Sequence, residues 1–157
     1  MSNNNRLIIF LPLFVLGCAP NVIDENKVIQ KIDSLDMTIF SKSGDKIYSI
    51  TSPNSSYNNI ELKFEIKKPI INIYNGEEIK YIISSEESTL SDNNKLLKLN
   101  GNVKLKTLKK DGDFLYADNF TWNIENTNYL LEGNIRFENQ NIILNSGKAI
   151  LLSLIHI

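Results

Sequence analysis

Residues 96–107, LLKLNGNVKLKT, alternate apolar and polar side chains on both sides of Gly101. A period of two places successive side chains on opposite faces of a β-strand, so the pattern predicts two short strands around a glycine turn. The pattern returns 32 positions later, where LEGNIRF at residues 131–137 matches LNGNVKL at residues 99–105. Such a repeat indicates stacked units that bury their apolar faces against one another. Gly101 and Gly133 take the equivalent turn positions and are predicted to adopt strained, positive φ angles.

The same alternation continues through residues 37–151, and no long helix is predicted after residue 36. Residues 60–67, IELKFEIK, form the clearest predicted strand, while the cluster SPNSS at residues 52–56 predicts a strand end. Asn75 and Gly76 are typical of a hairpin turn. A single flat sheet of this length would leave an apolar face in water. The sequence therefore predicts an all-β fold, an antiparallel twisted β-jelly roll with two facing sheets of short strands.

The inward face of the predicted strands has two interpretations. It is either a filled core or an apolar groove in which two sheets stay slightly apart and hold acyl chains. The side chains predicted to line it are Ile60, Leu62, Phe64, Ile66, Leu97, Leu99, Val103, Leu105, Phe120, Trp122, Ile135 and Phe137. The pattern leaves both interpretations open.

The N-terminal residues have the pattern of a secretory signal: a polar start, one cation at Arg6, and an apolar run from Leu7 to Leu16. That run is too short to span a bilayer, which requires about 20 apolar residues. The sequence VLGC at residues 15–18 resembles the bacterial lipobox, in which the cysteine is lipidated. We expect residues 1–17 to be a lipoprotein signal peptide, Cys18 the lipid anchor, residues 18–36 a tether, and residues 37–151 the folded domain.

The last residues, 152–157, read LSLIHI and resemble the translation of a sequencing adapter. We interpret this tail as non-native, which removes His156, the only histidine, from the natural protein. Cys18 is the only cysteine, so neither a catalytic triad nor a cysteine-rich metal site is predicted. Acidic pairs such as Glu86 and Glu87 are typical of solvated turns. The net charge of −1 argues against a nucleic-acid partner. The sequence therefore predicts no enzyme, cofactor or metal site.

Four segments carry a family likeness: LKLNGNVKLKT, LYADNFTWNIE at residues 115–125, LEGNIRF, and NIILNSGKA at residues 141–149. Together they resemble the LptC family and the related OstA-like, LptA-like repeats. The resemblance implies a periplasmic β-jelly roll that binds lipopolysaccharide in an apolar groove. Such a protein receives the lipid from an inner-membrane ABC transporter and passes it to an LptA-like bridge by edge-strand pairing.

The best-known family members keep an N-terminal membrane helix, whereas Cys18 is expected to anchor this chain at the periplasmic face of the inner membrane. The alternative interpretation is a structural, non-catalytic envelope lipoprotein with a filled β-sandwich.

Overall fold

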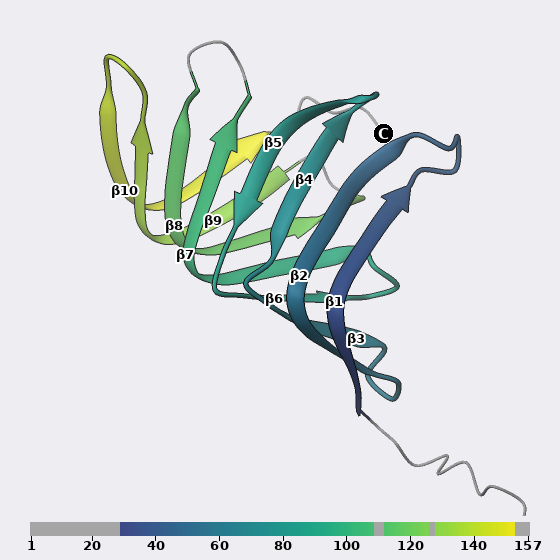
Figure 1. Cartoon of the computed structure of the whole chain (residues 1–157). Coiled ribbons are helices and arrows are strands. Elements are labelled where there is room, and N and C mark those ends of the chain that lie inside the picture. The colour runs from purple at the N-terminus through teal and green to yellow at the C-terminus, as the bar shows by residue number, and fades with distance from the viewer. Residues whose placement is uncertain (1–28, 109–111, 126–127, 153–157) are drawn as a thin grey trace, which may run out of the picture.

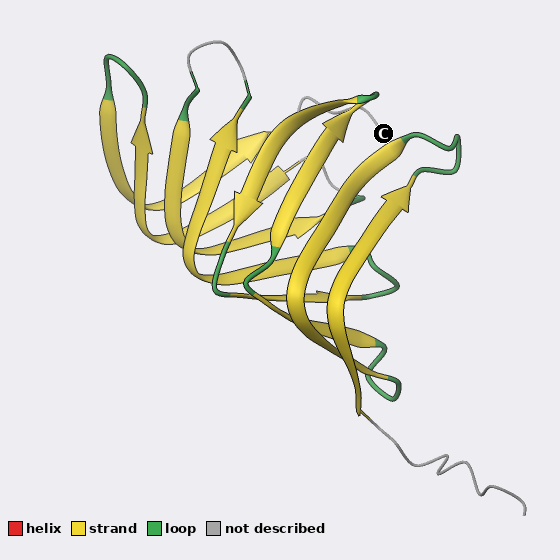
Figure 2. Ribbon diagram, viewed as in Figure 1, coloured by secondary structure: helices red, strands yellow, loops and turns green. Residues whose placement is uncertain are grey.

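The computed structural model describes residues 29–108, 112–125 and 128–152. Within these ranges the chain forms strands and turns and contains no helix (Figures 1 and 2). The strands are β1 (Ile29–Phe40), β2 (Lys46–Asn58), β3 (Lys63–Lys67), β4 (Ile70–Asn75), β5 (Glu78–Ser84), β6 (Glu87–Ser91), β7 (Leu96–Thr107), β8 (Phe114–Asn123), β9 (Asn128–Glu138) and β10 (Ile143–Leu152). The predicted signal peptide, Cys18 and residues 153–157 lie outside the described ranges.

All of these strands pair in antiparallel fashion in one ten-stranded sheet, ordered β10-β9-β8-β7-β5-β4-β2-β3-β6, with β1 on β2. The sheet folds over because its long strands change partners along their length. Residues 48–51 of β2 pair with β4, and residues 54–58 pair with β3. β7 likewise pairs first with β6 and then with β5. Two facing layers result (Figure 1): the first layer contains β4 and β5, and the second contains β3 and β6.

This arrangement confirms the predicted all-β, antiparallel jelly roll and corrects the predicted strand lengths. β7 is one bent strand and not two short ones. It crosses the corner between the layers at Gly101 and Asn102, whose φ angles are +74° and +47°. The register with β8 shifts there, which is a β-bulge that bends a strand without ending it. Gly133 and Asn134, with φ of +75° and +44°, do the same in β9. The sequence repeat is therefore a repeat of the bent strand.

The β2 strand also continues where the sequence predicted an end. Pro53 sits at its corner, between the part that pairs with β4 and the part that pairs with β3. A proline is tolerated at this point because the corner interrupts the regular ladder. The hydroxyl of Ser52, which has one proton to donate, lies 2.5 Å from the carbonyl oxygen of Lys67 and 2.8 Å from that of Asn54. Ser52 is therefore buried at the corner with its polar atom satisfied.

At the N-terminal end, β1 begins at Ile29, inside the stretch expected to be a tether. Residues 29–36 were predicted from their polar character to lie outside the domain, and instead they pair with residues 51–58 of β2. β1 has no second partner strand among the described residues. An edge strand with one solvated side tolerates polar residues such as Gln30 and Asp33. These residues interrupt the apolar alternation, so the sequence pattern did not indicate a strand here.

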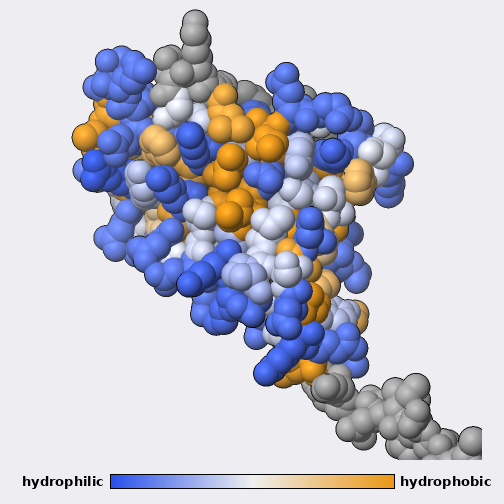
Figure 3. Space-filling view, viewed as in Figure 1, coloured by the Kyte–Doolittle hydropathy of each residue, from blue (hydrophilic) through white to orange (hydrophobic). Residues whose placement is uncertain are grey.

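The core lies between the two layers. Its most deeply buried side chains are Tyr48, Ile50, Ile66, Ile71, Ile73, Ile83, Leu90, Leu97, Leu99, Phe120, Trp122 and Leu131. Each such side chain contributes about 1.5–3 kcal/mol of transfer free energy relative to exposure. The outer face of the first layer, seen in Figure 3, carries apolar side chains over the middle strands within a hydrophilic surround. Ile70 on β4 is 49% exposed there.

Two of the predicted inward residues are not in this core. Ile60 and Leu62 are 74% and 52% exposed, because they lie in the turn between β2 and β3 and not on a strand. The turn is stabilised by the side-chain oxygen of Asn58, which accepts hydrogen bonds from the backbone N–H groups of Ile60 and Glu61, each at 3.0 Å. Strand β3 begins only at Lys63. The alternation in residues 60–62 therefore does not place side chains in the interior.

Candidate functional site

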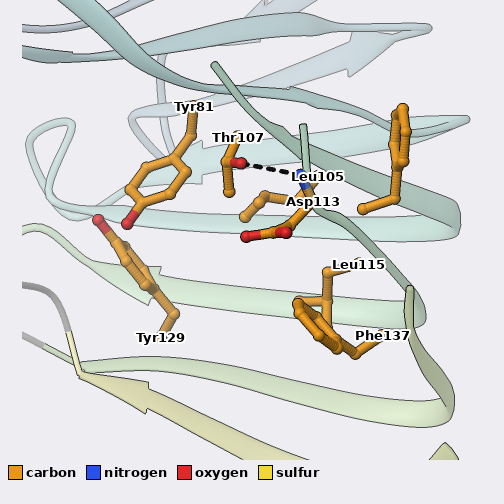
Figure 4. A pocket seen from close by; sticks show the side chains of 8 residues that line it. Tyr81, Leu105, Thr107, Asp113, Leu115, Tyr129 and Phe137 are labelled. Carbon is orange, nitrogen blue, oxygen red and sulfur yellow. Dashed lines mark hydrogen bonds between the residues drawn. The ribbon is translucent and has the colours of Figure 1, made fainter. Parts of the chain in front are cut away.

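The two layers meet at the corner and diverge toward their free ends, where an apolar cavity of about 190 Å³ opens between them. Strands β5, β7, β8 and β9 supply its walls (Figure 4). The cavity is lined by Tyr81, Leu105, Thr107, Asp113, Phe114, Leu115, Tyr129 and Phe137. The backbone N–H of Asp113 donates to the hydroxyl of Thr107 at 3.1 Å, so the polar atoms gather at one side of the opening. The remaining lining can accept hydrocarbon.

A row of aromatic rings joins the layers beside this cavity. Trp122 packs edge-on against Tyr48 and Tyr129, with ring centroids 5.6 and 5.4 Å apart. Tyr129 also meets Tyr81 edge-on at 6.5 Å, and Figure 4 shows their hydroxyl ends pointing toward one another. Tyr48 and Tyr81 belong to the first layer, whereas Trp122 and Tyr129 belong to the second. The row therefore bridges the space between the layers.

A second, shallower hollow of about 730 Å³ lies on the other side of this row, toward β1. Its lining includes Ile39 and Ile47 from the first layer and Asn93 and Ile124 from the second. The hydroxyl of Tyr48 donates to the carbonyl of Asn94 at 3.0 Å and so links the first layer to the turn after β6. Burial raises the pKa of the Tyr48 phenol above its usual range, so the hydroxyl stays protonated and able to donate.

The rim of this second hollow carries an ion pair. The ammonium of Lys95 lies 2.6 Å from a carboxylate oxygen of Glu125. The hydrogen bond to Glu125 raises the pKa of Lys95. Both side chains are well exposed, so the pair adds little to stability. It links the turn after β6 to the residues that follow β8.

Of the residues predicted to line a groove, only Leu105 and Phe137 line the cavity. Those that are buried in the core instead are Ile66, Leu97, Leu99, Val103, Phe120, Trp122 and Ile135. Phe64 is half-buried against the core and packs on Tyr57 with ring centroids 4.6 Å apart. The interior near the corner is therefore filled by the chain's own side chains, and space remains only toward the free ends of the layers.

Sequence reasoning missed the aromatic residues that define the cavity, namely Tyr81, Phe114 and Tyr129. Tyr81 follows the alternation of β5, in which Ile83 is buried two positions later, so period-two counting identifies its face. Phe114 pairs with Lys106 and Glu138 at the end of its strand, and nothing in the sequence indicates that it borders a cavity.

Gly101 and Gly133 have a shared local structure at the corner. The amide of Asn102 donates to Glu86 at 2.5 Å, and the amide of Asn134 donates to Asp118 at 2.8 Å. A Cβ atom on Gly101 would lie 2.4 Å from Glu86 Oε2, and one on Gly133 would lie 2.4 Å from Asp118 Oδ2. Glycine is required at both positions by the φ angle and by the acid that lies over it.

The described residues contain no group of three or more metal-ligating side chains. They also contain no helix that is long and apolar enough to cross a membrane. The lining of the cavity is apolar and aromatic, with Thr107 and Asp113 at its polar edge.

A family model described as lipopolysaccharide assembly, LptC-related, matches residues 13–148. The chain belongs to the LptC-related family. This membership confirms the resemblance found in the sequence and assigns the protein a role in lipopolysaccharide transport. No curated protein matches the chain.

The structure is also similar to that of LptH from Pseudomonas aeruginosa, described as the LptA-homologous periplasmic component of the conserved lipopolysaccharide transport device. The match has a TM-score of 0.53 at 8% identity and covers 66% of this chain and 73% of that one. At this identity the likeness concerns the fold alone. The two chains share the folded-over β-sheet.

Proposed function

We propose that this protein is a periplasmic, non-catalytic carrier that binds the acyl chains of lipopolysaccharide between its two layers and passes the lipid on. The observation that carries the proposal is the apolar cavity between the diverging layers, which has aromatic side chains in its walls. Membership of the LptC-related family supports lipopolysaccharide as the cargo. Movement of the row would join the two hollows into one groove that runs across the strands, from the β1 edge toward β10.

The size of the cavity requires such movement. Its volume of about 190 Å³ is below the roughly 300–1,000 Å³ of pockets that enclose drug-sized ligands. Aromatic contacts of the kind made by Tyr81, Tyr129 and Trp122 are worth about 0.5–1.5 kcal/mol each. Each methylene removed from water gains about 0.8 kcal/mol. An acyl chain that buries about four methylenes therefore offsets the loss of two ring contacts, so lipid can open the row that closes the empty protein.

A second candidate function is a structural envelope lipoprotein with a permanently filled interior. The complete burial of Leu97 and Leu99 favours this candidate, because a filled core leaves no room for acyl chains near the corner. The two candidates differ in whether the cavity-lining side chains meet lipid.

Photo-crosslinking in cells that make lipopolysaccharide distinguishes them. A benzophenone amino acid at Tyr81 or Phe137 replaces an aromatic side chain of the cavity with one of similar shape. Both positions should become covalently labelled with lipopolysaccharide. Glu65 and Thr121 lie on the outer face of the second layer and serve as controls that should remain unlabelled. Labelling at none of the four positions, or equally at all of them, would remove the carrier function and leave the structural one.

Transfer to the next component requires a free strand edge, and we infer that β10 supplies it. β10 pairs only with β9 among the described strands. At the corner, positive φ angles occur at Ser34 of β1, Gly101 of β7 and Gly133 of β9, whereas the corners of β2, β8 and β10 have none among the described residues. Strands with and without a positive φ angle at the corner therefore alternate, and the next strand beyond β10 should have one, as β1 does. An LptA-like bridge with this fold can supply such a strand, which would pair antiparallel with β10 and bend at the same corner.

The carrier must also be held near its lipid source. Lipidation of Cys18 would tether the domain to the periplasmic face of the inner membrane, and this part of the proposal rests on the sequence pattern alone. The residues between Cys18 and β1 then set the distance from the membrane.

A further inference from the structure

The corner of the sheet repeats one arrangement from strand to strand. β4 continues the line of β3 across the corner, and β5 continues that of β6, so each pair acts there as one bent strand. The ladder runs through these crossings, since the N–H of Lys68 donates to the carbonyl of Glu86 at 2.7 Å and the N–H of Glu86 donates to that of Gly101 at 3.0 Å. The corner is therefore a row of equivalent positions, one from each bent strand.

Positions with a positive φ angle alternate along this row with positions that have none. The register on either side of the corner identifies which residues lie next to one another. From the β1 edge to the β10 edge they are Ser34, Pro53, Lys68, Glu86, Gly101, Asp118, Gly133 and Gly147, of which Ser34, Lys68, Gly101 and Gly133 have positive φ angles. The last position, Gly147, lies at the free edge of β10.

Two of the corners combine an acid with a glycine. Asp118 lies over Gly133, and its carboxylate accepts a hydrogen bond from the amide of Asn134 at 2.8 Å. Glu86 makes the same two contacts with residues 101 and 102 of β7. In both cases a Cβ on the glycine would lie 2.4 Å from a carboxylate oxygen. An acid at the corner of one strand is therefore matched by a Gly-Asn pair at the corner of the next.

The corner between β2 and β3–β4 has no acid. Pro53 takes the place of the acid, and the neighbouring strand has Lys68, with φ of +48°, as the single positive-φ residue of its corner. A side chain at that residue is thus compatible with a neighbour that presents no carboxylate. β1 has a corner of the same kind, with Ser34 at φ of +60° and no shift of register with β2 at that point.

Gly147 leaves the acid position of β10 without a side chain. Its register with β9 is the same as the register of Asp118 with β7, so it takes the place of the acid. Its φ angle is not positive, and nothing lies within 4 Å of a Cβ placed on it. The β10 edge therefore presents no carboxylate to the corner of a strand that extends the sheet.

We propose that the β10 edge selects its partner strand at the corner, and that the strand it takes has a single residue with a side chain there. β1 of a second copy of this chain is such a strand, and we take it as the partner. This inference rests on the proposed use of β10 as the joining edge, and it names what that edge recognises. A strand with a Gly-Asn corner would find no acid for its asparagine amide at Gly147.

The side chains that flank the corner complement this partner. In the existing pairs the residue after the acid position lies opposite the residue before the positive-φ position, as Asn119 lies opposite Glu132. The same register places Lys148 opposite Asp33 of the second copy, which are opposite charges. On the inner face it places Leu144, which is 58% exposed, against Met37. The contact therefore continues both the ladder and the apolar interior from one copy into the next.

The test exchanges corners between two purified copies of the full chain. The bait carries a benzophenone amino acid at Ile150, which the register places opposite Lys31 of the second copy, and has either the natural Gly147 or Gly147→Asp. The prey carries an affinity tag and has either the natural Ser34 or a Gly-Asn pair in its place. The four combinations are mixed, irradiated and compared by the yield of tagged, crosslinked product.

The matched control is a bait with Gly147→Ala. Pro53 beside Lys68 shows that a side chain without a carboxylate is tolerated next to a corner of the β1 kind, so this bait should behave as wild type. Both bait variants should keep the wild-type urea midpoint, because the new side chain meets no atom of its own domain within 4 Å.

The wild-type bait should label the Ser34 prey about 10-fold more than the Gly-Asn prey, in the segment around Lys31. Gly147→Asp should invert this preference, because its carboxylate crowds the side chain of Ser34 and accepts a hydrogen bond from the introduced asparagine. A preference that stays the same in all baits, or loss of both products with Gly147→Asp, would overturn selection at the corner. So would a wild-type bait that labels neither prey, or labels it elsewhere. Labelling of Tyr81 and Phe137 by lipopolysaccharide measures the carrier function separately, so its failure is distinguishable from failure of the edge.

Discussion

Replacement of Gly133 by alanine tests the structure of the corner most directly. The new Cβ would lie 2.4 Å from Asp118 Oδ2 and 2.9 Å from Asp118 Cβ. The Cβ of Asp118 is fixed to its backbone and cannot swing away, so the two strands must separate locally. Such overpacking costs about 1–3 kcal/mol. The φ of +75° adds about 1–2 kcal/mol for any residue with a Cβ. We expect Gly133→Ala to lower the free energy of unfolding by about 2–5 kcal/mol.

Two other glycines separate these contributions. At Gly76 the φ is +63° and nothing lies within 4 Å of a new Cβ, so Gly76→Ala should cost only the backbone term, about 1 kcal/mol. At Gly101 the closest contact is with the carboxylate of Glu86, which can rotate away and lose its exposed hydrogen bond to Asn102, and the Cβ of Glu86 is at 3.1 Å, farther than that of Asp118 from Gly133. That loss is worth about 0.5–1 kcal/mol, so Gly101→Ala should fall between the other two.

Urea denaturation of the three variants and of a double mutant cycle between Gly133→Ala and Asp118→Gly measures these terms. The cycle should give a favourable coupling of about 1–2 kcal/mol, because removal of the aspartate side chain relieves the clash but not the backbone term. Equal destabilisation of Gly133→Ala and Gly76→Ala, or a coupling near zero, would refute the claim that the acid of one strand lies over the glycine of the next.

The remaining predictions concern attachment at the two ends of the domain. Cys18→Ser should abolish incorporation of a labelled fatty acid, because the thiol is the only acceptor in the chain, and undiminished label would refute the anchor. A photo-crosslinker at Ile150, which is 62% exposed on β10, should capture the bridge protein in cells, whereas one at Thr89 should not, because β6 is paired on both sides. Capture at Thr89 with none at Ile150 would contradict pairing through the β10 edge.

The fold class could be predicted because the side-chain period survives the bends. In β7 and β8 the residues that alternate in sequence also alternate in burial, as Leu97, Leu99, Phe120 and Trp122 are buried while Lys98 and Asn119 are exposed. The bends themselves could not be read correctly. A glycine or a proline between two alternating runs is equally compatible with a turn that reverses the chain and with a bulge that bends one strand. Only the partner strands decide between them, and these come from distant sequence.

The candidate site was less predictable for a different reason. Alternation identifies which face is inward, but it carries no information on how far apart two inward faces lie. Leu99 and Leu105 have the same pattern, yet Leu99 is in the filled core and Leu105 borders the cavity. The difference lies in which side chains face each residue from the opposite layer. Those side chains come from distant parts of the sequence, so no local pattern encodes the cavity.

The unbroken hydrogen-bond ladder from β1 to β10 makes this fold extensible in one dimension. Each added hairpin contributes one strand with a positive-φ corner and one without, as β7 with β8 and β9 with β10 do. Adding or removing strands in pairs therefore preserves the direction of the edge strand and whether its corner has a positive φ angle. Adding or removing a single strand would change both. Proteins of different length built on this plan remain compatible at their edges, provided that they differ by whole hairpins. Length can then vary during evolution without loss of the capacity to join end to end.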